Sequence, residues 1–181
     1  MNDLQLILVG WADLYRMTAE AAGALVGLLF VVVSLVAQRM EDETLDADKV
    51  RSKIGAYLTP TVIFFVSVLL ADCLLVFPHH TPLSATLCIC LLGVIGLAYA
   101  GSMLVGGRKT YFEWHDLIPY AVIPFAAYVL LALSGVLLLH DAQLGLTLVA
   151  VSLLSLLALG IRNSWAIAMN VASIRFIPHQ S

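Results

Sequence analysis

The chain has 181 residues, of which 61% are hydrophobic and 12% are charged, and its formal net charge is -3. Soluble domains are about 45–50% apolar and about 25% charged, so this composition excludes a protein whose whole surface faces water. The slightly acidic balance also gives no sign of a nucleic-acid partner. The sequence therefore predicts a protein whose main solvent is the lipid bilayer.

Five apolar stretches are long enough to cross a bilayer, because a helical span needs about 20 mostly apolar residues. Short turns join the second stretch to the third and the fourth to the fifth, and turns this short make the joined helices antiparallel neighbours. We expect an all-α polytopic bundle, a single membrane domain over residues 1–181, with two hairpins and the first span apart from them on its longer loop. The predicted spans are residues 19–38, 54–77, 83–105, 117–139 and 144–161.

The first span has one small or polar side along its whole length. At about 100° per residue, the residues of this side fall within about 60° of the line through Glu20. The opposite side is bulky and includes Ala22, Leu25 and Leu29, and we expect lipid to contact it. We call the small and polar side the stripe, and it consists of Glu20, Gly23, Ala24, Gly27, Val31, Ser34 and Gln38.

Two interpretations of the stripe remain open. Gly23-x-x-x-Gly27 is typical of helices that pack closely, which favours a non-conducting scaffold or accessory subunit that docks a partner helix. The other hypothesis is a homo-oligomeric channel for small cations, lined by the first helix. Glu20 would then form an outer mouth and Val31 an apolar constriction, since acidic rings select cations and apolar constrictions gate by dewetting. Ser34 and Gln38 would form the inner polar lining.

Asp72 lies inside the second span near its outer end. Ionisable groups within spans usually face a protein interior or a wet cavity, so Asp72 joins Glu20 as a candidate acidic group for a cation or a proton at the outer mouth. A third hypothesis is a metal-dependent membrane enzyme that uses ligands at the outer ends of the spans. These candidate ligands are His79, His80, His140, Asp141 and Asp72.

No nucleophile–base pair, phosphate-binding loop or paired metal-ligand motif occurs in the sequence. We therefore expect no enzymatic activity, no cofactor and no bound metal. The expected partners are the bilayer, further copies of the same chain and small cations.

Proline and glycine add local expectations. Pro60 and Pro119 fall in the first turns of their spans, where proline is natural. Pro124 lies deeper and predicts a bend, because proline removes a backbone donor. The third span is rich in glycine, which predicts close packing against its neighbours.

Basic residues gather in alternate connections, which indicates the orientation of the chain. Because basic residues mark the cytoplasmic side, we expect the N-terminus outside and the C-terminus inside, with residues 162–181 as a cytoplasmic tail. Residues 4–17 mix Trp11 and Tyr15 with Asp13 and Arg16, which is typical of a helix lying at the headgroup level. The basic residues concerned are Arg39, Lys49, Arg51, Lys53, Arg108, Lys109, Arg162 and Arg175.

Two short stretches carry a resemblance to known sequences. They are AAGALVGLLFVVVSL at residues 21–35, followed by a charged loop, and RNSW at residues 162–165 after the last span. Both resemble stretches of a group of small uncharacterised bacterial inner-membrane proteins. The resemblance implies a bacterial cytoplasmic membrane and supplies no activity, ligand or catalytic residue.

Overall fold

The computed structural model describes residues 3–42, 47–77, 81–106 and 118–173, and the side chains of residues 6–34, 58–77, 81–105 and 118–169. The predicted all-α fold is confirmed, since no β-strand occurs in these ranges. The elements are α1 (Asp3–Asp42), α2 (Ala47–Val76), α3 (Pro82–Gly106), a π-helical turn η2 (Ile118–Val122), α5 (Ile123–Leu137) and α6 (Ala142–Ser173).

Five helical stretches within these ranges are long and apolar enough to cross a membrane, as predicted. They are Leu6–Ser34, Leu58–Val76, Pro82–Val105, Ile118–Leu137 and Ala142–Met169. The main difference concerns α1, because residues 4–17 continue directly into the first span instead of forming a separate helix at the headgroups. The sequence at the expected junction, RMTAEAA, contains good helix formers and no proline, so nothing ends the helix there.

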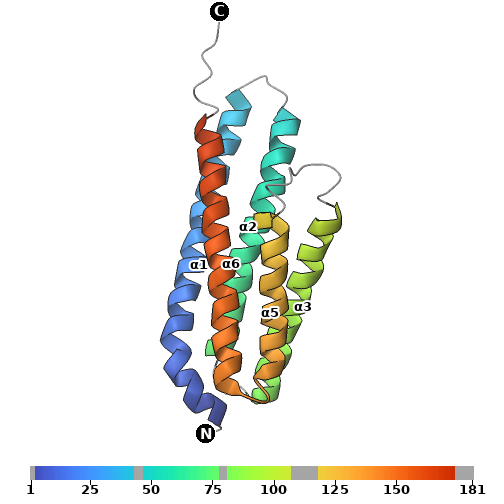
Figure 1. Cartoon of the computed structure of the whole chain (residues 1–181). Helices are drawn as coiled ribbons and strands as arrows, with labels where there is room; N and C mark the ends of the chain where they lie inside the picture. Colours follow the sequence, from blue (N-terminus) through green and yellow to red (C-terminus); the bar gives the residue numbers. More distant parts are fainter. Residues whose placement is uncertain (1–2, 43–46, 78–80, 107–117, 174–181) are drawn as a thin grey trace, which may run out of the picture.

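The helices run side by side in a bundle, and α1 begins and α6 ends at opposite ends of it (Figure 1). The expectation that the first span stands apart is wrong, because α1 packs along α2 and also contacts α6. The α5–α6 hairpin is tightly packed, as expected. By contrast, α3 makes its main contact with α5 and only a small one with α2, to which its short turn joins it. Loop length set the antiparallel direction of these helices but not the choice of partner.

Glycine residues explain why α3 packs mainly against α5. A Cβ atom added to Gly93 would lie 2.7 Å from the backbone nitrogen of Ala132, and one added to Gly96 would overlap the ring of Tyr128. From the other side, a Cβ on Gly135 would lie 2.7 Å from the Sγ of Cys90. The two backbones therefore approach each other where side chains are missing, which confirms the predicted close packing of the third span at these positions.

Pro60 and Pro124 differ from the sequence expectation, whereas Pro119 lies in the first turn of its span, as expected. Pro60 lies inside α2, not in its first turn, because α2 begins at Ala47. Pro124 lies in the first turn of α5, directly after η2, which contains Pro119. Just before Pro124 the backbone changes from a π-helical turn to an α-helix, and Pro124 lacks the backbone donor that a regular ladder needs.

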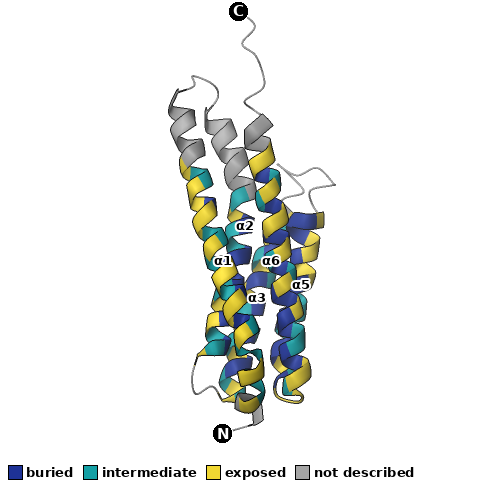
Figure 2. Ribbon diagram, turned by 90° about the vertical axis from the view of Figure 1, so that its left-hand side faces the viewer, coloured by how far each residue is buried: buried dark blue, intermediate teal, exposed yellow. Residues whose placement is uncertain are grey.

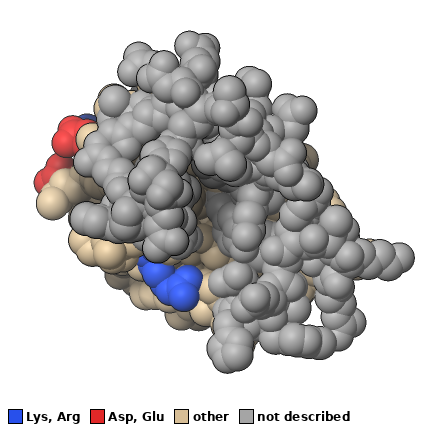
Figure 3. Space-filling view, turned by 90° about the horizontal axis from the view of Figure 1, so that it is seen from above, with Lys and Arg blue, Asp and Glu red and all other residues tan. Residues whose placement is uncertain are grey.

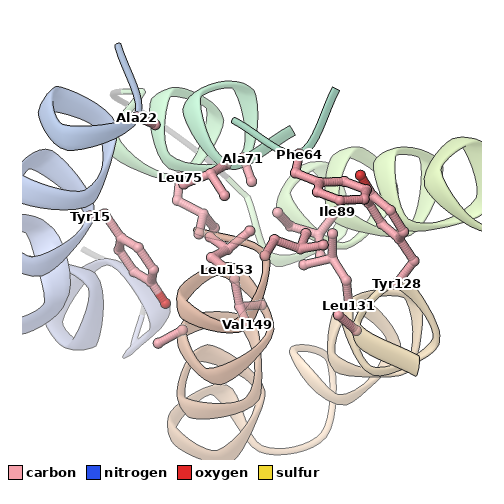
Figure 4. Packing of buried hydrophobic residues seen from close by; sticks show 14 of the residues in the cluster. Tyr15, Ala22, Phe64, Ala71, Leu75, Ile89, Tyr128, Leu131, Val149 and Leu153 are labelled. Carbon is pink, nitrogen blue, oxygen red and sulfur yellow. The ribbon is translucent and has the colours of Figure 1, made fainter. Parts of the chain in front are cut away.

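The core is formed by apolar side chains from all five helices. Inside it, the hydroxyl groups of Ser67 and Tyr128 are 2.9 Å apart and hydrogen bonded, and the Ser152 hydroxyl donates to the Ala127 carbonyl at 2.7 Å. These bonds join α2 to α5 and α6 to α5. The residues labelled in Figure 4 are Tyr15, Ala22, Phe64, Ala71, Leu75, Ile89, Tyr128, Leu131, Val149 and Leu153.

Candidate functional site

The stripe of α1 faces away from the bundle. Val31 is 55% exposed, and within the described part of the chain no other segment comes within 4 Å of a Cβ atom added to Gly23 or Gly27. Figure 2 shows exposed residues along the outer side of α1, opposite the buried side that contacts its neighbours. Gly23 is half-buried, and the side chain of Gln38 lies outside the described residues. The exposed members of the stripe are Glu20, Ala24, Gly27, Val31 and Ser34.

The bulky side of α1 is covered by protein. Ala22 and Leu29 are buried, and Leu25 packs against the core. The expectation that lipid contacts this side is therefore wrong at these positions. The bulky residues fit against α2 and α6, and this arrangement leaves the stripe facing away from the described helices, with open space at Gly23 and Gly27.

Charged side chains lie mostly at the outside of the bundle. In the view from above, the described charged groups that can be seen lie on the surface beside the grey residues, with the acidic ones at one edge of the molecule (Figure 3). Arg16 and Asp13 form an exposed ion pair on α1 with an N–O distance of 3.6 Å. Among the charged side chains that the structure describes, Asp72 alone is buried, with an exposed fraction of 0%.

Asp72 lies at the contact between α1 and α2, where Tyr15 and Thr18 are its polar neighbours. The Thr18 hydroxyl is close to the carboxyl group, but its donation goes to the backbone carbonyls of Leu14 and Tyr15, at 3.0 and 3.1 Å. The Tyr15 hydroxyl donates to the carbonyl of Leu146 in α6 at 2.9 Å. Neither carboxyl oxygen of Asp72 has a hydrogen-bond partner among the described residues.

The structure does not bring Glu20 and Asp72 together. Glu20 is exposed, whereas Thr18, two residues earlier and about 200° around the helix, faces Asp72. The two acids therefore lie on opposite sides of α1. Sequence reasoning placed Asp72 inside a span but missed Tyr15 and Thr18 as its neighbours. The sequence feature that could have identified these neighbours is the presence of two polar residues, Tyr15 and Thr18, on the bulky side of the first helix.

The metal hypothesis finds no cluster in the described part of the chain. No group of three or more His, Cys, Asp and Glu side chains suited to a metal ion occurs there. His140 and Asp141 are exposed in the α5–α6 connection, and the Asp141 carboxylate accepts a hydrogen bond from the Leu144 backbone at 3.0 Å, which caps α6. His79 and His80 lie outside the described residues.

Comparison of this chain with family models, curated proteins and solved structures finds no match. Its class is therefore defined by its own fold, which is that of an all-α, multi-pass membrane protein with five candidate spans around one core. Two features of this fold are candidates for function, the outward stripe of α1 and the buried carboxyl group of Asp72.

Proposed function

We propose that this protein forms a homo-oligomer in the cytoplasmic membrane of a bacterium and conducts small cations along the stripe of α1. The observation that carries this proposal is the exposure of Glu20 on the outer side of a candidate membrane span. A carboxyl group within a span is costly against lipid and is normally found facing protein or water. A ring of copies with α1 at its centre provides both.

The rest of the stripe suits the lining of such a ring. Below Glu20, Ala24 and Gly27 are small enough to leave a throat, and Val31 provides an apolar constriction. Acidic rings favour cations over anions, and apolar constrictions gate by dewetting. The alternation of basic residues supports an orientation in which Glu20 is at the outer mouth, and the resemblance at residues 21–35 and 162–165 supports the bacterial location.

The test is conductance of the purified protein in planar bilayers. Glu20→Gln should reduce the preference for cations over anions, and Val31→Ser should raise the open conductance because it makes the constriction wettable. The matched control is Val94→Ser on α3, since Val94 is 57% exposed and Val31 is 55% exposed. The proposal is contradicted if the wild type does not conduct, or if Val31→Ser and Val94→Ser behave alike.

A second candidate function is a non-conducting scaffold, and the open space at Gly23 and Gly27 favours it. In this case the stripe docks another helix closely, and Gly27→Leu abolishes assembly while Glu20→Gln has little effect. A protein that assembles through Gly27 without conducting ions would support the scaffold over the channel.

A further inference from the structure

Asp72 is a carboxyl group enclosed by protein near the C-terminal end of α2. It lies one turn before the end of α2 at Val76, and both of its oxygens are shielded from solvent. A buried carboxylate is stable only when it is paired, hydrogen bonded or neutralised by a proton. Neither oxygen is hydrogen bonded to any described residue, so the group needs a ligand that the fold itself does not supply.

The surroundings contain no described basic group that would pair with Asp72. On α1, Tyr15 is the titratable group that faces it, while Asp13 and Arg16 are exposed and paired with each other. In α6, the backbone carbonyl of Leu146 accepts the hydrogen bond from Tyr15. The basic residue of this helix whose side chain is described, Arg162, lies toward its other end. On α3, the Cys90 thiol donates to the Ala132 carbonyl of α5, away from α2.

The other titratable side chains that the structure describes near this end of the bundle form no hydrogen bond or ion pair with Asp72. Cys73, its neighbour on α2, is exposed, and Cys88 of α3 is half-buried. His140 and Asp141 are exposed in the α5–α6 connection.

The size of the site selects the ligand. Because protein atoms cover both carboxyl oxygens, no room remains beside them for a hydrated metal ion, whereas a proton needs none. We propose that Asp72 is a proton-binding site enclosed between α1 and α2, and that the bound proton holds α1 against α2. This proposal stands independently of the channel, because it concerns the opposite side of α1 from the stripe.

Release of the proton has a structural consequence. It leaves a bare carboxylate in the α1–α2 contact, and water reaches that carboxylate only when α1 moves away from α2. Tyr15 is positioned to respond, because its hydroxyl links α1 to Leu146 of α6 and its ring stacks on Trp11 with a centroid distance of 6.1 Å. The site is thus a proton-dependent latch on α1.

Infrared spectroscopy of the full chain in lipid nanodiscs tests the bound proton directly. Near neutral pH, the wild type should show the carbonyl band of a protonated carboxylic acid, and isotopic labelling of aspartate but not of glutamate should shift it. The band should be absent from Asp72→Asn and present in Glu20→Gln. Absence of the band from the wild type, or its retention in Asp72→Asn, overturns the proposal. The labelling arm needs no substitution, so it stands even if Asp72→Asn fails to fold.

The fluorescence of Trp11, which stacks on Tyr15, can detect the opening of the α1–α2 contact. In a Trp114→Phe/Trp165→Phe background, raising the pH until the acid band disappears should shift the Trp11 emission to longer wavelength, because the α1–α2 contact opens. The same titration of Asp72→Asn should leave the emission unchanged, and His79→Gln/His80→Gln should behave as the background does. Loss of the acid band with constant Trp11 emission overturns the latch, and a shift that persists in Asp72→Asn does so as well.

Discussion

Gly96 and Gly10 are both helical glycines, but only Gly96 lacks space for a side chain. A side chain at Gly96 would overlap Tyr128, which is fully buried and tied to Ser67, whereas Gly10 has nothing within 4 Å of an added Cβ atom. Gly96→Ala should lower the free energy of unfolding by about 1–3 kcal/mol, as overpacking does. Gly10→Ala should raise it by about 0.5–1 kcal/mol, because alanine favours the helix. Denaturation in mixed detergent micelles measures both, and equal stabilities would contradict this packing of α3 on α5.

Among whole elements, α1 shows best how the bundle is held together. Two consecutive leucines have opposite environments, since Leu28 is 61% exposed and Leu29 is 4% exposed. Leu29→Ala should cost about 2–5 kcal/mol of unfolding free energy, because it leaves a cavity against the core. Leu28→Ala should stay within about 0.5 kcal/mol of the wild type. The same denaturation assay separates the two, and an equal, small loss in both would mean that lipid covers the bulky side of α1.

For the whole molecule, the unpartnered stripe predicts association of copies. Native mass spectrometry from nanodiscs should find a ring of several copies, and Gly27→Leu should shift it toward monomers, because leucine prevents close approach of another helix. Gly10→Leu is the matched control, since Gly10 also faces open space but lies outside the stripe. A wild-type protein that is monomeric would contradict the shared conduit.

Hydropathy predicted the five spans well, because a run of about 20 apolar residues has few stable places other than a bilayer. It did not predict what each side of a span contacts, since lipid tails and the packed side of another helix are equally apolar. Leu28 and Leu29 are identical in the sequence and differ only through the position of α2 and α6. Periodicity therefore identified the two sides of α1 correctly but assigned the bulky side to lipid.

The partners of each helix and the neighbours of Asp72 depend on tertiary packing, which no single span reveals. The helix α3 packs on α5 because Gly93 and Gly96 leave space for Ala132 and Tyr128, which follow an intervening loop in the sequence. Asp72 could be placed inside its span from the sequence alone. Its proximity to Tyr15 and Thr18 required knowing how α1 turns toward α2.

The length of α1 has a mechanical consequence. An unbroken helix of 40 residues is about 60 Å long, roughly twice the thickness of the hydrocarbon layer. It is anchored near one end by the bond from Tyr15 to Leu146, and its other end reaches Asp42, where the charged loop begins. Because α1 also packs along α2 and contacts α6, a sideways load on that far end is carried by these contacts together with the Tyr15 bond.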